Sequence, residues 1–172
     1  MHQDIRSIQA PLKARYLAEP QVARVTLVAT GQLDDQAIAC NVETGRAMAK
    51  AGLHPATGGD GSLICSGDML LQALVACAGV TLKAVAESMQ IRLEGGRVTA
   101  EGDLDFRGTL GVGREAQVGF TDIRLRFELA TDAPPDKVQA MQRLTERYCV
   151  VYQTLEAPAQ LSTEFITNRM AR

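Results

Sequence analysis

The most informative segment of the chain is MLLQALVACAGVTL, residues 69–82, in which Cys77 stands among alanine, glycine and aliphatic residues. An apolar run of about 14 residues is too short to cross a bilayer, so it predicts a buried core helix, which we place at residues 66–89. Ser66 is the predicted N-cap, and Asp68 in the first turn suits the positive end of the helix dipole. A helix that is apolar all round must be covered on more than one side, which predicts a homodimer.

The composition narrows the class of protein. The chain has 172 residues and a net charge of −2, and no basic stripe favours nucleic acid as a partner. Residues 1–6 lack the charged-then-apolar pattern of an export signal, and no apolar run is long enough for a membrane span, so we expect a cytoplasmic protein with no membrane partner. Thiols in that compartment are mostly reduced, so the four cysteines do not indicate a structural disulfide framework.

The rest of the chain predicts an α+β domain with helices packed on antiparallel sheet. The clearest strand is residues 118–130, where Ile123, Leu125 and Phe127 alternate with charged residues. Other strands are expected at 22–30, 37–43, 97–106 and 160–167, a turn at 31–35, a glycine-rich loop at 44–62, and helices at 5–19 and from Pro135.

Cys149 follows Cys77 by 72 residues, at a point where the helix begun at Pro135 falters. The two thiols can be buried core residues, or a redox pair in which one thiolate is oxidised and the other traps the product. If a new helical turn begins at Cys149, its backbone N–H groups would lower the pKa of that thiol. Both interpretations remain open on spacing alone.

Cys65 is the alternative partner of Cys77. Twelve helical residues rise about 18 Å, whereas a disulfide needs Cα atoms within about 7 Å. A bond between them would demand local unfolding, which makes Cys149 the better candidate. Cys40 alternates with its strand neighbours and is expected in the core.

The histidines and glycines predict no cofactor site. The chain has two histidines, and His54 has neither a second histidine nor a Cys-x-x-Cys pair at ligand spacing, so no metal is expected. A Cys–His nucleophile would need His54 to be oriented by a third group, and no neighbour suggests one. The glycine loop at 58–61 lacks the Gly-Lys-Ser/Thr end of a phosphate loop.

The segments Gly58-Gly59-Asp60, Gly67-Asp68-Met69-Leu70-Leu71 and Ala73-Leu74-Val75-Ala76-Cys77 resemble the approach to the first cysteine in OsmC/Ohr proteins, the osmotically induced and organic-hydroperoxide-resistance proteins. Cys149 is similar in position and helical context to the family's second cysteine. The resemblance covers roughly residues 20 to 168, within one domain of residues 1–172 whose first 20 form a helical extension.

The resemblance implies an intertwined α+β homodimer with antiparallel sheets around a central apolar helix and with sites at the subunit interface. It implies a peroxidase active in oxidative stress defence without metal or bound cofactor. Cys77 would attack an organic hydroperoxide and become a sulfenic acid. Cys149 would condense with it to a disulfide, which a dithiol reductant, often lipoyl-linked, would reduce.

Three departures from the family pattern identify a divergent OsmC-like subgroup. Well-studied members carry Glu ten residues before the first cysteine, whereas this chain has Gly67 there and its acid, Asp68, one residue later. On a straight helix Asp68 lies about 180° from Cys77, which disfavours contact. The family's activating Arg has no match in the first strand-turn, where Arg46 is the nearest candidate, and the second cysteine precedes valine instead of proline.

Two functions therefore follow from the sequence. The first is a cysteine-based peroxidase with Cys77 and Cys149 as catalytic residues and Asp68, Arg46, Cys65 and His54 as supporting candidates. The second is a non-catalytic OsmC-like protein that binds a small molecule or senses redox state.

Overall fold

The computed structural model describes residues 9, 14, 18, 30–33, 39–43, 48–111 and 114–167. Its helices are α2 (Ser66–Ser88), α3 (Phe106–Thr109), α4 (Pro135–Tyr148) and α5 (Val150–Glu156), and a 3-10 turn, η2, spans Pro55–Thr57. Its strands are β1 (Thr30–Leu33), β2 (Ala39–Glu43), β3 (Met48–Gly52), β4 (Ile64–Cys65), β5 (Gly95–Leu104) and β6 (Phe120–Ala130). The predicted α+β class is confirmed.

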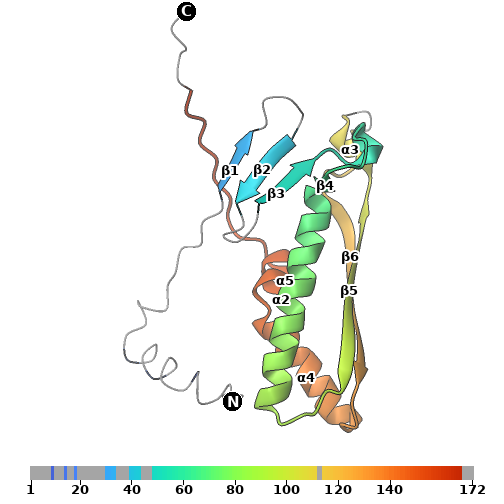
Figure 1. Cartoon of the computed structure of the whole chain (residues 1–172), viewed down its shortest axis with the longest axis vertical. Coiled ribbons are helices and arrows are strands. Elements are labelled where there is room, and N and C mark those ends of the chain that lie inside the picture. Colours follow the sequence, from blue (N-terminus) through green and yellow to red (C-terminus); the bar gives the residue numbers. More distant parts are fainter. Residues whose placement is uncertain are drawn as a thin grey trace, which may run out of the picture.

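The apolar segment around Cys77 forms the central helix, α2, as predicted. Figure 1 shows α2 with the β5–β6 ribbon on one side and α5 on the other, while α4 packs near its C-terminal end. Its buried stripe comprises Leu74, Ala78, Leu82, Val85 and Ala86. The helix begins at Ser66, so its N-cap is Cys65, one residue before the predicted cap.

α2 is the one described helix that is long and apolar enough to span a membrane by length and composition. Core helices of soluble proteins meet the same criterion. Here the buried stripe of α2 packs against α4, α5 and β5 within the protein, which agrees with the predicted core helix.

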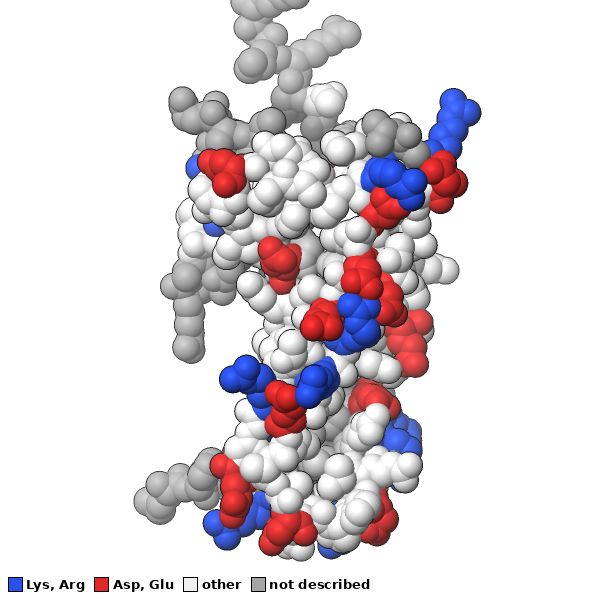
Figure 2. All heavy atoms as spheres, turned by 90° about the vertical axis from the view of Figure 1, so that its right-hand side faces the viewer, with Lys and Arg blue, Asp and Glu red and all other residues white. Residues whose placement is uncertain are grey.

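The strand predicted at 118–130 is confirmed as β6, which pairs antiparallel with β5. Ile123, Leu125 and Phe127 are half-buried and pack against the cluster around Leu74. The alternate residue Arg124 is exposed and pairs with acidic side chains of both strands. Figure 2 shows charges of both signs interspersed down this face, as expected for a solvated strand surface.

The other sheet has the order β1-β2-β3-β4, antiparallel except for the short parallel β3–β4 pair. Two predictions are wrong here. Residues 31–33, expected in a turn, belong to β1, and the expected loop at 44–62 contains β3. Both segments are weak strand formers by composition, and each is a strand because its backbone pairs with β2.

The strand predicted at 160–167 is absent, because these residues have no ladder partner among the described strands. Leu161, Phe165 and Ile166 are 94%, 89% and 81% exposed. The predicted helix at 5–19, apart from positions 9, 14 and 18, and the predicted strand at 22–29 lie outside the described residues.

Candidate thiol site

Cys77 lies in the middle of α2, half-buried at the edge of the buried stripe. It packs against a cluster whose buried members are Leu74, Ala78 and Cys149. The fold therefore places the two predicted cysteines side by side, although 72 residues separate them in the sequence.

Cys149 occupies the junction between α4 and α5 and is 1% exposed. Its backbone is extended, with φ −76° and ψ 108°, so α4 ends there and α5 begins one residue later. Its N–H still donates to Thr145 O at 2.9 Å, and its carbonyl accepts from Gln153 N at 2.9 Å. The new helical turn considered from the sequence at this point is therefore α5, which begins at Val150.

The Cys77 side chain packs against Cys149, and hydrogen bonding between the two thiols lowers the pKa of Cys77 and raises that of Cys149. Burial acts to raise the pKa of Cys77, but hydrogen bonds from the backbone N–H of Val151, the Cys149 thiol, the Val150 N–H and the Thr81 hydroxyl lower it below the ordinary thiol value. The first turn of α5 therefore stabilises the thiolate of a residue on a different helix.

The pKa of Cys149 shifts in the opposite direction. Burial raises the pKa of its thiol, and the hydrogen bond and charge of Cys77 raise it further, against the lowering effect of the Tyr152 and Val151 N–H groups. The prediction that the new helical turn would lower the pKa of Cys149 is therefore wrong in its net direction. Burial outweighs the amides there, and it is Cys77 whose pKa falls.

Thr81 is a member of the site that sequence reasoning missed. It lies four residues after Cys77 on α2, and residues at this spacing share a helix face. Hydrogen bonding from the Thr81 hydroxyl is one of the causes that lower the pKa of Cys77. The i, i+4 spacing was the available signal.

The other supporting candidates lie elsewhere. His54, Cys65 and Asp68 line a separate cavity of about 330 Å³ at the N-terminal end of α2. The His54 ring stacks on Phe106 with centroids 4.8 Å apart, and its Nδ1 accepts from Ala56 N at 3.0 Å. None of the three is among the groups that shift the pKa of Cys77.

Arg46 lies outside the described residues, so its predicted role stays a prediction. The groups that lower the Cys77 pKa are uncharged hydrogen-bond donors. No cluster of three or more His, Cys, Asp or Glu side chains suited to a metal occurs among the residues that the structure describes.

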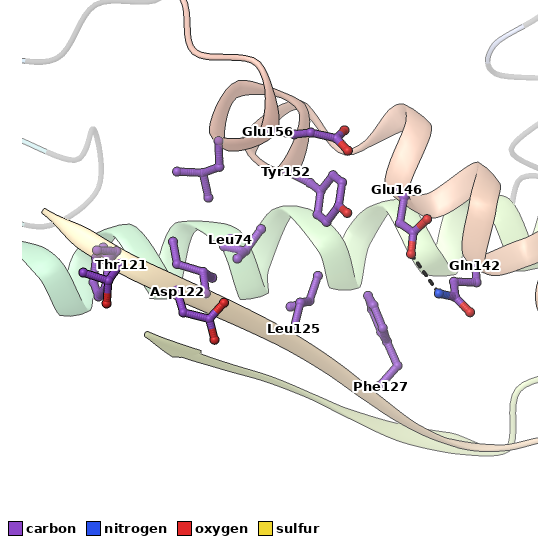
Figure 3. A pocket seen from close by; sticks show the side chains of 12 residues that line it. Leu74, Thr121, Asp122, Leu125, Phe127, Gln142, Glu146, Tyr152 and Glu156 are labelled. Atoms are coloured by element: carbon purple, nitrogen blue, oxygen red, sulfur yellow. Dashed lines mark hydrogen bonds between the residues drawn. The ribbon is translucent and has the colours of Figure 1, made fainter. Parts of the chain in front are cut away.

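A cavity of about 490 Å³ lies between α4, α5 and β6, next to the thiol cluster. Figure 3 shows Leu74 of α2, Leu125 and Phe127 of β6 and Tyr152 of α5 around it. Sequence reasoning missed this cavity because its lining residues come from four separate elements.

Fold and site together define an α+β protein in which one cysteine of the core helix packs against a second cysteine at the junction of two other helices. Residues 59–164 match the family described as OsmC-like protein, and this chain belongs to that family. No curated protein sequence matches it significantly.

Solved structures agree on the fold. An OsmC-like protein from Mycoplasma pneumoniae superposes with a TM-score of 0.65 at 15% identity, over 78% of this chain and 89% of that one. An organic hydroperoxide resistance protein OsmC from Legionella pneumophila gives 0.60 at 16% identity, over 77% and 90%. The organic hydroperoxide resistance protein OhrB of Bacillus subtilis gives 0.51 at 17%, over 78% and 93%.

Proposed function

We propose that this protein is a thiol peroxidase that reduces organic hydroperoxides, with Cys77 as the peroxidatic cysteine and Cys149 as the resolving one. The observation that carries the proposal is the packing of Cys77 against the buried Cys149, in a pair in which the pKa of Cys77 is lowered and that of Cys149 is raised. The attacking group is the thiolate, so a pair polarised in this way assigns the first step to Cys77.

The reaction proceeds in three balanced steps. The Cys77 thiolate attacks the terminal oxygen of the hydroperoxide, an S–O bond forms, the O–O bond breaks, and the alkoxide takes up a proton to leave as an alcohol. Cys149, as its thiolate, then attacks the sulfenic sulfur; an S–S bond forms, the S–O bond breaks, and the hydroxide takes up a proton and leaves as water. A dithiol, such as a lipoyl-linked one, restores both thiols by exchange and becomes a cyclic disulfide.

The donors around Cys77 suit this chemistry. Hydrogen bonds from the Val150 and Val151 amides and from Thr81 stabilise negative charge on sulfur without blocking it with a salt bridge. The raised pKa keeps Cys149 protonated until Cys77 has reacted, because part of the increase comes from the Cys77 charge itself. Oxidation of Cys77 removes that charge and favours deprotonation of the resolving thiol.

We also propose that the working unit is a cytoplasmic homodimer. The apolar side chains of Leu161, Phe165 and Ile166 are almost fully exposed in a single chain, and Val80 on α2 is 73% exposed. Apolar surface of this kind is a frequent mark of a subunit interface.

A non-catalytic redox sensor is the second candidate function. It is favoured by one observation, that no charged donor is among the groups that lower the Cys77 pKa. A sensor thiol would form the same disulfide but would not be turned over rapidly by a reductant.

The test is anaerobic addition of cumene hydroperoxide to reduced protein, followed by non-reducing peptide mapping by mass spectrometry. A stoichiometric Cys77–Cys149 disulfide and loss of peroxide consumption in Cys77→Ser are expected, with Cys65→Ser as the matched control that retains both. Unchanged peroxide consumption in Cys77→Ser would overturn the proposal. A disulfide that forms once but is not cycled by dihydrolipoamide or another dithiol would favour the sensor.

A further inference from the structure

The cavity between α4, α5 and β6 has the volume and the apolar floor that are typical of a small-molecule binding site. Its volume of about 490 Å³ lies within the usual range of such sites, about 300–1,000 Å³. Leu74, Leu125 and Phe127 project into it and make its floor apolar (Figure 3). An apolar body of one ring and a short chain would bury its surface there.

The polar residues of the cavity carry one sign of charge. Asp122, Glu146 and Glu156 are among its lining residues, which include no lysine, arginine or histidine. Arg124 pairs with Asp122 and also with Asp103 and Glu101. The remaining two carboxylates face the cavity from α4 and α5.

Among the residues that the structure describes, Glu146 and Glu156 have only neutral hydrogen-bond partners. The Gln142 amide donates to Glu146 Oε1 at 2.8 Å, and the Gln153 amide donates to Glu156 Oε2 at 3.0 Å. None of the ion pairs found among the described residues includes either carboxylate. Within the described part of the chain, no cation therefore pairs with these two carboxylates, which line a cavity with an apolar floor.

Tyr152, which also lines the cavity, is affected by the negative charges of Glu146 and Glu156. Its ring lies between the two glutamates in Figure 3. Burial raises the pKa of its phenol, and the charges of Glu146 and Glu156 raise it further. An aromatic ring flanked by carboxylates also offers its face to a cation.

We propose that this cavity is a binding site for an amphipathic cation, a small molecule with an apolar body and one ammonium-type group. The apolar part would rest on Leu74, Leu125 and Phe127, and the ammonium group would lie between Glu146, Glu156 and the Tyr152 ring. Anions of the same shape are disfavoured because both carboxylates repel them. The site goes beyond the proposed peroxidase function and does not depend on it.

The site lies close to the thiol pair. Leu74, Tyr152 and Leu155 belong both to the cavity wall and to the cluster around Cys149. The Tyr152 N–H also bonds the Cys149 sulfur. One layer of side chains therefore separates the ligand from the buried thiol.

Isothermal titration calorimetry on the full-length protein with three probes of one shape tests the proposal: phenylbutylammonium, phenylbutanol and phenylbutyrate. With two partly screened ion pairs, the ammonium probe should bind about tenfold more tightly than the carboxylate probe. The double variant Glu146→Gln/Glu156→Gln should remove that preference and leave the affinity for phenylbutanol unchanged.

The matched control is Glu94→Gln/Glu115→Gln, which changes the net charge equally at two exposed positions outside the cavity and should keep the full preference. If the cavity double variant fails to fold by circular dichroism, Glu156→Gln alone carries the test, with about threefold loss expected. Equal affinities for the three probes, absence of binding up to the solubility limit, or equal losses in both double variants would overturn the proposal.

Discussion

The half-buried Cys77 side chain in the middle of α2 packs against the buried Cys149 side chain at the junction of α4 and α5. The junction places the first N–H groups of α5 next to the Cys77 sulfur. A break between two helices thus serves two purposes, because it positions the second thiol and supplies donors to the first.

The two thiols should become reactive at different pH values. The Cys77 pKa is lowered and the Cys149 pKa is raised, so the alkylation rate of Cys77 should rise with pH before that of Cys149. Iodoacetamide labelling over a pH series, read by mass spectrometry for each peptide, measures both profiles. In Cys77→Ser the Cys149 profile should move to lower pH, because the hydrogen bond and charge of Cys77 are gone. The reverse order of the two profiles would contradict the assignment of roles.

Thr81 should act as a positioning residue for the Cys77 thiolate. Thr81→Val removes the hydroxyl with little change of shape, and it should raise the pKa of Cys77. Hydrogen bonds to charged groups contribute about 1.5–3 kcal/mol, but the Thr81 hydroxyl shares the Cys77 thiolate with other donors, so its own contribution is smaller. We therefore expect Thr81→Val to react about fivefold more slowly with hydroperoxide near neutral pH.

The conservative variant Thr81→Ser is the control, because it keeps a hydroxyl at the same position. It should retain most of the wild-type rate and the wild-type pH profile of thiolate absorbance. If Thr81→Val and Thr81→Ser had the same pH profile, the change in rate would be due to packing and not to the loss of the hydrogen bond.

Much of the fold is readable from the sequence where a pattern is long. The apolar run in α2 extends over more than two helical turns, and the alternation in β6 extends over several strand residues. Each pattern is long enough for its period to predict the structure. β3 was missed because Met48–Gly52 has little intrinsic strand preference, and its state depends on pairing with β2.

The site was predictable only in part. The break before Val150 is visible as a faltering helical pattern, which placed Cys149 at a helix start. Which sulfur receives the α5 amides depends on how α5 lies against α2, and no local pattern contains that information. The cavity lined by Glu146, Tyr152 and Glu156 needs β6 and α2 as its other walls, so it emerges only in three dimensions.

Leu74 should be a major source of stability. It is 1% exposed and belongs to the cluster around Cys149. Leu74→Ala removes most of a fully buried side chain, so the free energy of unfolding should fall by about 3 kcal/mol. Chemical denaturation followed by circular dichroism measures the loss. The matched control, Leu110→Ala at a position 54% exposed, should change it by less than about 0.5 kcal/mol.

The exposed C-terminal segment should hold two chains together. Leu161, Phe165 and Ile166 expose apolar side chains that would each contribute about 1.5–3 kcal/mol if a second chain buried them. Sedimentation velocity should therefore find a dimer, and Phe165→Asp/Ile166→Asp should shift it to monomer, because a charge buried without a partner is strongly unfavourable. The control Leu110→Asp/Val118→Asp places the same charges at two other exposed apolar positions and should leave the dimer intact. A monomeric wild-type protein, or equal dissociation of both double variants, would show that this segment is not the interface.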